Sequence, residues 1–243
     1  MLDLGQWTRN REFHRYVDDG TLDLYARHSG SQSGIGRLCL LDDRVLAEIV
    51  RAADLSSRAR VLDIGCGRGF LARWLRWYKV DTRYVGVDTV PEAVAAARRN
   101  APQSEFVYAQ LDSLGINESF DRVFALEPPS GGALSAEVAA AIGRHLEPGG
   151  RFVVTLISLD GAHEEKILRS IDLLQRHADV EQVCDLSLQV KEFASTMYSA
   201  FLLGAWDDAI KSQMCVKAAY VLHAIEGGTF NYTMLTGTRQ EAA

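Results

Sequence analysis

The sequence predicts an α/β fold, a mostly parallel seven-stranded sheet with helices on both faces. Three observations indicate this fold class. Short runs rich in β-branched and aromatic residues alternate with helical runs through the middle of the chain. The glycine-rich stretch GCGRG, at 65–69, connects the first of these runs directly to a helical run. The run at 230–238 follows a long helical segment and supplies a last strand. Such alternation is typical of a parallel sheet that helices cover on both sides.

The individual elements follow from local composition and from residues that start or stop them. Pro91 opens a helix, where its missing N–H has no helical partner in any case. Ser135 is suited to cap the next helix, which the breaker EPGG at 147–150 ends. The predicted core helices span 70–79, 91–100, 135–146 and 163–178. The predicted strands span 60–64, 83–88, 105–109, 120–126, 151–157, 180–186 and 230–238.

The whole chain, 1–243, is expected to be one domain with two helical additions. Residues 1–57 would form an N-terminal helical cover, in which 41–53 is the clearest helix. Residues 58–160 would form the core, and 190–226 a helical cap inserted before the last strand. Ligands of open α/β sheets bind outside the carboxyl ends of the strands. We therefore expect the cap to cover that edge.

Composition narrows the classes of partner. With 47% hydrophobic and 24% charged residues, the chain of 243 residues has the composition of a globular protein with a sizeable core. Its formal net charge of -6 disfavours nucleic acid or an anionic membrane as the main partner. No apolar run is long enough to span a membrane, and the start of the chain does not resemble a secretion signal. The four cysteines form no CxxC pair, which favours a reducing cytoplasm and no metal site.

The glycine loop is the clearest functional signal. Glycines at 65, 67 and 69 allow the backbone to approach a ligand without an intervening Cβ, and the helix that follows offers free N–H groups. A dinucleotide loop, G-x-G-x-x-G, would place its third glycine at position 70, where this chain has Phe70. Asp63, two residues before the first glycine, suits a ligand with a positive ammonium group and disfavours a pyrophosphate.

Asp88 ends the second predicted strand. A carboxylate at this place can accept hydrogen bonds from both hydroxyls of a ribose. The alternative is that Asp88 only caps the next helix, a role that Thr89 could also fill.

Together these motifs resemble those of the class I S-adenosylmethionine-dependent methyltransferases. The resemblance rests on VLDIGCGRGFLARWL, YVGVD, FVYAQLDSLGINESFDRVFAL and LEPGGRFVVTLI, which follow one another over about 58–160, and the final FNYTMLTGTR extends it. It implies a Rossmann-like fold, S-adenosyl-L-methionine as cofactor and S-adenosyl-L-homocysteine as product. It also implies that Gly65, Cys66 and Gly67 lie along the methionine part of the cofactor, with Asp63 orienting the loop or the ammonium group.

The resemblance further implies how the adenosyl part is bound. Asp88 would hold the ribose hydroxyls, and Thr89 would pack against the adenine. The family usually has an aspartate where this chain has Gln110, whose side-chain oxygen can still accept from the adenine amine, with Asp112 as the alternative acceptor. The backbone N–H of Leu111 would meet a ring nitrogen.

The residues that handle the methyl acceptor are less directly indicated. Methyl transfer from a sulfonium requires mainly that donor and acceptor are aligned, and the sequence shows no nucleophilic triad. The run EPPS, from Glu127, stands where methyltransferases of amide or base nitrogens often carry Asn-Pro-Pro-aromatic, which disfavours those substrates. Glu127 could contact the cofactor, hold a cationic acceptor, act as a base, or be a solvated loop carboxylate. His28, in HSGSQSG, and Tyr25 are further catalytic candidates, with a mobile surface loop and core packing as the respective alternatives.

Aromatic and methionine side chains of the predicted cap could roof an apolar pocket, although ordinary core packing is the alternative. They recur at helix-like spacing and are Phe193, Met197, Tyr198, Phe201, Trp206 and Met214. His163 could face the same site or be a surface residue at the start of a helix.

The leading hypothesis is an enzyme, a methyltransferase of the EC 2.1.1 type that methylates a small, partly apolar metabolite, as in natural-product biosynthesis. The cover and the cap resemble those of phosphoethanolamine and sarcosine methyltransferases. An alternative with the same fold binds S-adenosylmethionine but catalyses a cyclisation or rearrangement without methyl transfer. A non-catalytic binding protein and an NAD oxidoreductase are further alternatives. The expected partner is a small molecule, not a nucleic acid or a membrane, and a homodimer stays open.

Overall fold

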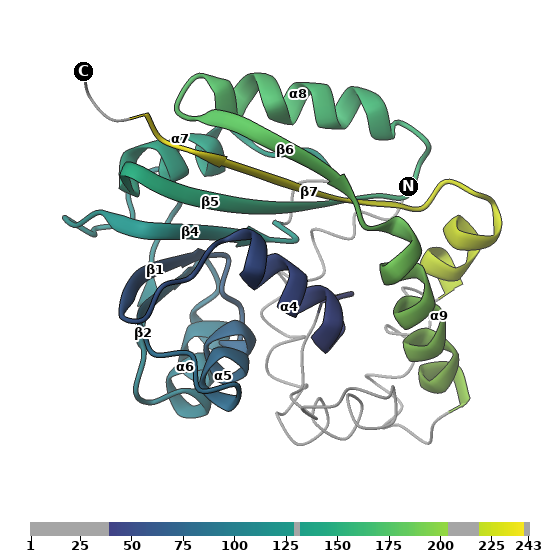
Figure 1. Ribbon diagram of the computed structural model, residues 1–243. Coiled ribbons are helices and arrows are strands. Elements are labelled where there is room, and N and C mark those ends of the chain that lie inside the picture. The colour runs from purple at the N-terminus through teal and green to yellow at the C-terminus, as the bar shows by residue number, and fades with distance from the viewer. Residues whose placement is uncertain (1–38, 129–131, 204–218, 241–243) are drawn as a thin grey trace.

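Seven strands form one sheet in the part of the chain that the structure describes. The strands are β1 Ala59–Ile64, β2 Thr82–Asp88, β3 Glu105–Tyr108, β4 Phe120–Leu126, β5 Leu146–Ser158, β6 Asp179–Asp185 and β7 Asn231–Thr238. They lie in the order β3-β2-β1-β4-β5-β7-β6 (Figure 1). β7 runs antiparallel to both of its neighbours, and the other neighbouring strands are parallel. The predicted fold class is confirmed.

The computed structural model describes residues 39–128, 132–203 and 219–240, without the side chains of 197, 198 and 200–203. The labelled helices are α4 Asp43–Ala52, α5 Phe70–Trp77, α6 Pro91–Asn100, α7 Ala136–His145, α8 His163–Gln175 and α9 Ser187–Leu203. A further helix spans 219–226. Within these described ranges, every helix is too short or too polar to cross a lipid bilayer.

The two faces of the sheet carry separate hydrophobic cores. In the first core, α4, α5, α6 and α9 pack on one face of the sheet, and in the second, α7 and α8 pack on the other (Figure 1). Because side chains alternate along a strand, Val61 of β1 lies in the first core and Leu62 in the second. In β7, Tyr232 lies in the first core and Leu235 in the second. Burial on both faces explains why β1 and β5 have nearly continuous apolar runs.

Most element boundaries lie close to the predicted ones, and β5 and α8 differ from the prediction by several residues. α6 and β4 have the predicted bounds, whereas β5 begins at Leu146 and not at 151. The EPGG segment does end α7, yet it stays attached to the sheet. The Gly149 N–H donates to the Arg239 carbonyl (2.8 Å), and the Arg239 N–H donates to the Gly150 carbonyl (3.0 Å). α8 ends at Gln175, earlier than the predicted 178.

The predicted division into cover, core and cap falls partly outside the described residues. Of the predicted cover, 1–38 lies outside them, and α4 is the described helix. Of the predicted cap, α9 and the helix at 219–226 are described, and both precede β7. The functional division into three parts stays a prediction.

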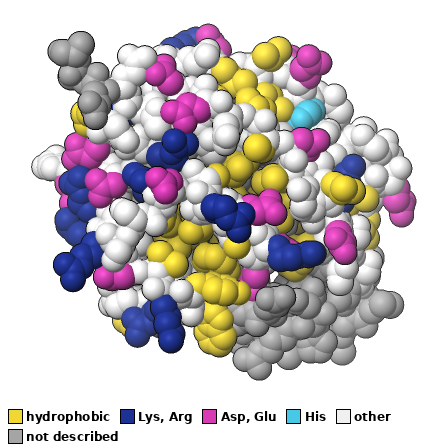
Figure 2. Space-filling model, in the orientation of Figure 1, with side chains coloured by type: hydrophobic (Ala, Val, Ile, Leu, Met, Phe, Trp, Pro, Cys, Tyr) yellow, Lys and Arg dark blue, Asp and Glu magenta, His cyan; other side chains and the backbone are white. Residues whose placement is uncertain are grey.

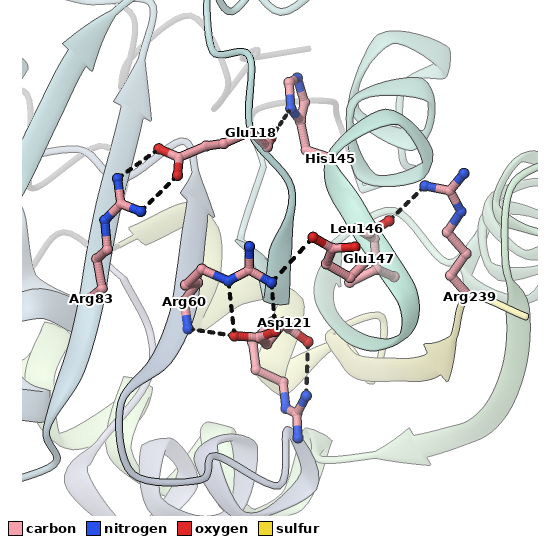
Figure 3. Close-up of polar contacts among 9 residues, drawn as sticks. Arg60, Arg83, Glu118, Asp121, His145, Leu146, Glu147 and Arg239 are labelled. Carbon is pink, nitrogen blue, oxygen red and sulfur yellow. Dashed lines mark hydrogen bonds and ion pairs between the residues drawn. The ribbon is translucent and has the colours of Figure 1, made fainter. Parts of the chain in front are cut away.

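Ion pairs join the strands at the sheet edge where β1, β4 and β5 begin (Figure 3). Arg60 of β1 donates to Asp121 of β4 through its backbone N–H (2.8 Å), through Nε (3.3 Å) and through Nη2 (3.0 Å). Arg60 Nη2 also donates to Glu147 of β5 (3.1 Å). The hydrogen bonds from the Arg60 guanidinium lower the pKa of Asp121. One arginine thus connects three neighbouring strands.

Asp121→Asn is expected to lower the free energy of unfolding by about 1 kcal/mol, because it weakens a partly exposed, charge-assisted contact. The pKa of Asp121 is lowered in the folded protein. Its stabilising contribution is therefore present above the pKa of a free aspartate and is lost as the pH falls through the folded value. Urea unfolding at pH 7 and at acid pH measures both effects.

The matched control is Asp172→Asn, which breaks an exposed pair between α8 and Arg176, the C-cap residue of that helix. That variant should change the stability less, since exposed pairs within one helix contribute only about 0.3–0.5 kcal/mol. Equal losses of unfolding free energy for Asp121→Asn and Asp172→Asn at pH 7 would contradict the stabilising role of the contact between Arg60 and Asp121.

Candidate functional site

The glycine loop leaves β1 at the carboxyl edge of the sheet and leads into α5. The Gly65 and Cys66 N–H groups both donate to the Val87 carbonyl of the neighbouring β2 (2.8 and 3.0 Å). Gly65, Gly67 and Gly69 have φ angles of 80°, 54° and 78°. This left-handed conformation costs a residue with a Cβ roughly 1–2 kcal/mol. The path of the loop therefore requires glycine at these positions.

The glycines of the loop face different surroundings. A Cβ on Gly69 would lie 3.1 Å from side-chain atoms of both Ala97 and Phe106, so this glycine allows α6 and β3 to pack against the loop. A Cβ on Gly65 or Gly67 would meet no atom of the described residues within 4 Å. These two glycines present bare backbone to open space, which a ligand can use.

Asp88 ends β2 and connects the loop to the next helix. Its Oδ2 accepts from the Gly67 N–H (2.8 Å), and its Oδ1 accepts from the Val90 N–H (2.9 Å). Val90 is the N-cap residue of α6, and no side-chain hydrogen bond caps this helix, so Asp88 fixes the residue before the helix without capping it. Since a carboxylate has about four acceptor positions, the same side chain can also receive ligand hydroxyls. Thr89 follows it and is half-buried.

Asp63 lies at the end of β1 and is almost completely buried, with 2% of its surface exposed. The Tyr84 hydroxyl donates a hydrogen bond to its Oδ2. Burial raises the pKa of Asp63 to about 7, and the negative charge of Asp88 adds to this, while the Tyr84 hydrogen bond opposes it. Gly86 of β2 stands directly opposite Asp63, and the side chains of Cys66 and Phe106 fill the place that a Gly86 side chain would take.

Cys66 contributes its backbone to the loop, while its side chain faces inward. The thiol is buried in the first core, and a Cβ on Gly86 would lie 2.8 Å from the Cys66 Cβ. Burial raises the pKa of this thiol well above its usual value, and the charges of Asp88 and Asp63 add to the effect. Any contact between Cys66 and a ligand in the loop is therefore made by the main chain.

The segment after β3 adjoins Asp88. The Ala109 N–H donates to the Asp88 carbonyl (3.2 Å), which holds this segment beside the end of β2. Gln110 and Asp112 are exposed, and Leu111 packs against the second core. The structure thus brings these residues to the same edge as the loop, and their contacts with adenine stay predictions.

Glu127 follows β4 and is tied into a hydrogen-bond network that crosses three strands. Its N–H donates to Thr155 Oγ1 (2.9 Å), and its Oε1 accepts from the Leu40 N–H (2.7 Å) and the Tyr232 hydroxyl (3.1 Å). The Tyr232 hydroxyl also lies 3.0 Å from Thr155 Oγ1. Burial and the nearby Glu127 charge raise the pKa of Tyr232 well above its usual value. Glu127 is therefore not merely a solvated loop carboxylate, because it joins residue 40 to the ends of β4, β5 and β7.

Tyr84, Thr155 and Tyr232 were not among the residues that the sequence singled out. The sequence contained a signal for Tyr84, because this residue alternates with Gly86 and Asp88 along β2 and so shares their face. The sequence contained no such signal for Thr155 and Tyr232, since their contact with Glu127 depends on how β5 and β7 pair.

His163 contacts β7, and Phe193 packs in the core. His163 Nε2 is 3.4 Å from Thr233 Oγ1 of β7, three strands from β1, and partial burial lowers the pKa of His163. Phe193 of α9 is buried in the first core, as expected for core packing. The remaining candidates lie outside the described residues or have side chains that are not described: His28, Tyr25, Met197, Tyr198, Phe201, Trp206 and Met214.

A groove of about 540 Å³ lies between α4 and α5. In the view of Figure 2, hydrophobic side chains gather near the centre of the molecule, with basic and acidic side chains beside them. The groove is lined by Asp43, Arg44, Ala47, Val50, Arg51, Asp54, Leu55, Trp74, Tyr78 and Val80. No residue of 65–69 lines it, so the groove is separate from the loop.

Among the described residues, no group of three His, Cys, Asp or Glu side chains could hold a metal ion.

Comparisons with known proteins identify the family. Residues 61–150 match the methyltransferase-domain family. Within residues 61–150 this chain carries a class I S-adenosylmethionine-dependent methyltransferase domain. It is 31% identical over 113 residues to trans-aconitate 2-methyltransferase of Methylobacterium nodulans, covering 46% of this chain and 44% of that protein. It is 28% identical over 140 residues to methyltransferase GfsG of Streptomyces halstedii, covering 55% and 50%. The chain thus spans half or less of the length of these relatives.

Solved structures share the fold of this methyltransferase domain. Phosphoethanolamine N-methyltransferase 2 of Haemonchus contortus, in complex with S-adenosyl-L-methionine, matches with a TM-score of 0.72 at 17% identity, over 95% of this chain and 60% of that one. The [4+2]-cyclase SpnF matches with a TM-score of 0.66 at 19% identity, over 82% of each chain. The resemblance predicted from the sequence is confirmed at the level of family and fold.

Gly67→Ala and Gly69→Ala are both expected to destabilise the domain, by about 1–2 kcal/mol for the left-handed backbone alone. Gly69→Ala should cost more, because its Cβ would also crowd Ala97 and Phe106. Urea unfolding of the two variants measures the difference between their free energies of unfolding. Gly228→Ala, also at positive φ (73°) with no atom within 4 Å of the added Cβ, measures the backbone cost outside the loop. A loss for Gly69→Ala no larger than that for Gly228→Ala would contradict the packing role.

Proposed function

We propose that this methyltransferase domain binds S-adenosyl-L-methionine at the loop 65–69 and transfers its methyl group to a small, partly apolar metabolite. The observation that carries the proposal is the bare backbone at Gly65 and Gly67, where an added Cβ would meet no atom within 4 Å in the part of the chain that the structure describes. Two carboxylates, Asp63 and Asp88, flank this backbone from neighbouring strands. A ligand with an ammonium group at one end and a ribose at the other matches this arrangement.

Each part of the cofactor has candidate partners in the chain. The amino-acid part would lie along the main chain of 65–67, near the start of α5, whose N–H groups favour its carboxylate. Asp88, which holds the Gly67 and Val90 N–H groups, would also accept from the ribose hydroxyls. Thr89 and Leu111 would flank the adenine, with Gln110 or Asp112 accepting from its amine.

The protein's contribution to the reaction is mainly positional. The bound cofactor supplies a methyl group that is already activated on a sulfonium. Holding donor and acceptor in line, away from water, contributes about 7–11 kcal/mol in comparable reactions. Glu127 is our candidate for the acceptor side, since its Oε1 is fixed by the Leu40 N–H and the Tyr232 hydroxyl at the end of β4. We propose that Glu127 orients a cationic or proton-bearing acceptor group.

The substrate class is proposed from two sources. The relatives named above carry the names of small molecules, trans-aconitate and phosphoethanolamine. A third match, geranyl diphosphate C-methyltransferase of Streptomyces coelicolor A3(2), has a TM-score of 0.62 at 13% identity, over 82% of this chain and 79% of that one. The partly apolar character of the acceptor is inferred from the aromatic residues of 190–226.

A second candidate is supported by the match to the [4+2]-cyclase SpnF. In this alternative the domain binds S-adenosylmethionine but rearranges or cyclises its substrate. Incubation with cofactor labelled in its methyl group and a panel of small acceptors distinguishes the two. Label in the product supports methyl transfer, whereas a converted substrate without label supports the alternative.

Asp88→Ala is expected to weaken S-adenosylhomocysteine binding by about 1–3 kcal/mol, or about 5- to 150-fold in Kd, because ribose hydroxyls and loop N–H groups lose their acceptor. Isothermal titration calorimetry measures the Kd. Asp81→Ala, at the exposed start of β2, is the control and should bind like the wild type. Unchanged affinity of Asp88→Ala would mean that the ribose is held elsewhere.

Glu127→Gln is expected to keep the affinity for S-adenosylhomocysteine within a few-fold and to lower turnover by at least about tenfold. The glutamine oxygen can still accept from the Leu40 N–H and the Tyr232 hydroxyl, so the local structure should persist. The measurements are the Kd of the cofactor product and kcat with an acceptor found in the labelling experiment. Parallel losses of affinity and turnover would instead make Glu127 a cofactor residue.

A further inference from the structure

Glu127 has a strained backbone at the place where β4 ends. Its φ angle is 50°, in the left-handed region that disfavours a residue with a Cβ. Such a conformation persists only where the surrounding contacts fix it, and residues of this kind cluster at functional sites. The contacts that hold Glu127 must therefore offset the strain.

Two buried hydroxyl groups from neighbouring strands supply these contacts. Thr155 of β5 and Tyr232 of β7 are both completely buried. Thr155 lies opposite Met234 in the antiparallel pair, so Tyr232 is its diagonal neighbour on the same face. Leu126 of β4 lies opposite Thr155 on the other side, which brings the next residue, Glu127, close to both hydroxyls. The pairing of β4, β5 and β7 thus builds the network.

The number of available protons decides the direction of the hydrogen bonds. The Tyr232 hydroxyl has one proton but lies 3.1 Å from Glu127 Oε1 and 3.0 Å from Thr155 Oγ1. Glu127 Oε1 also accepts from the Leu40 N–H at 2.7 Å, a length typical of an ionised acceptor. An ionised Glu127 cannot donate. Tyr232 therefore donates to Glu127, and the Thr155 hydroxyl donates to Tyr232.

The result is a closed ring of hydrogen bonds that begins and ends at Glu127. The Glu127 N–H donates to Thr155 (2.9 Å), Thr155 to Tyr232, and Tyr232 to the Glu127 carboxylate. Burial and the Glu127 charge raise the pKa of Tyr232 well above its usual value, so its hydroxyl keeps the proton that the ring requires. The two donors to Oε1, an amide N–H and a neutral hydroxyl, stabilise the anion without neutralising its charge.

We propose that Thr155 and Tyr232 are positioning residues that hold Glu127 ionised and fixed in orientation, so that it selects a methyl acceptor by a positively charged amino group. Glu127 is half-buried, so water screens its charge only in part. A protonated amine would gain a charge-assisted contact, a neutral alcohol would gain less, and a carboxylate would be repelled. The ammonium group is held in this way whichever atom of the acceptor is methylated. The selection rests on the proposed function, in which the acceptor binds beside Glu127.

The experiment is calorimetric titration of small probes at pH 7 into the whole protein saturated with S-adenosylhomocysteine. The probes form two matched sets: 3-phenylpropylamine, 3-phenylpropanol and 3-phenylpropionate, and hexylamine, hexanol and hexanoate. Within each set the carbon skeleton is the same and only the polar group differs. In at least one set the amine should bind at least about tenfold more tightly than the alcohol, and the carboxylate should bind most weakly.

Variants of the ring test the roles of its members. Glu127→Gln should abolish the preference for the amine over the alcohol, because glutamine accepts the same hydrogen bonds without the charge. Tyr232→Phe and Thr155→Val open the ring and should reduce the preference by about two- to tenfold. Thr155→Ser keeps the hydroxyl and should retain the preference of the wild type.

The matched control is Thr236→Val. Thr236 lies on the same face of β7 as Tyr232, since both positions share the alternation of the strand. Its hydroxyl is buried and has no hydrogen-bond partner within the described residues. Loss of this hydroxyl leaves the ring intact, so the preference for the amine should persist.

The outcomes separate this selection from the proposed function. Failure of the wild type to bind S-adenosylhomocysteine would overturn the proposed function. With S-adenosylhomocysteine bound, an amine that binds no more tightly than its alcohol in both sets would overturn only the selection. An equal preference in the wild type and Glu127→Gln would do the same. Equal losses of preference in Thr155→Ser and Thr155→Val would overturn the positioning role, and these two variants decide it should Tyr232→Phe fail to fold.

Discussion

The attachment of the glycine loop to the end of β2 is the constraint on which the rest of this edge depends. Three consecutive N–H groups of the loop, those of Gly65, Cys66 and Gly67, are bound by the Val87 carbonyl and the Asp88 carboxylate. Their orientation forces positive φ at the glycines and turns the Cys66 side chain into the core. α5 therefore starts at a fixed place, and the backbone of Gly65 and Gly67 faces outward. The proposed ligand site is a consequence of satisfying backbone hydrogen bonds at the carboxyl edge of two parallel strands.

The carboxylates at the two edges of the sheet have different surroundings. Where β1, β4 and β5 begin, Asp121 and Glu147 are paired with Arg60 in contacts that solvent partly reaches. At the other edge, Asp63 is buried with a neutral partner. The first arrangement stabilises the fold. The buried Asp63 lowers the stability of the folded protein increasingly as the pH rises from the pKa of a free aspartate to about 7. The reason is that the folded protein favours the protonated acid. A buried acid with a raised pKa, placed beside a glycine loop, is typical of a functional site.

The fold was predictable from sequence because its signals are local. Pro91 fixed the start of α6, Ser135 caps α7 as expected, and the apolar runs located β1, β4 and β5. Of the candidate site, only the glycine loop and Asp88 were predictable, because short sequence motifs indicate them. Alternation along β2 placed Tyr84 on the face of Gly86 and Asp88, but the contacts of Asp63 and Glu127 were not predictable, because Tyr84 is 21 residues from Asp63 and Tyr232 is 105 residues from Glu127. Contacts at such separations depend on strand order and register, which residue periodicity alone does not specify.

The antiparallel direction of β7 explains why Tyr232 reaches Glu127. The parallel strands end at the edge that carries the loop, and β7, which runs the other way, begins there, with Asn231 opposite Ser158 at the end of β5. The chain that precedes β7 must therefore return to this edge after α9. A parallel last strand would have begun at the opposite edge, beside Arg60 and Asp121. Reversal of this one strand thus places both a buried tyrosine and the segment leading into it at the edge where the ligand is proposed to bind, and it does so independently of the side chains that the segment carries.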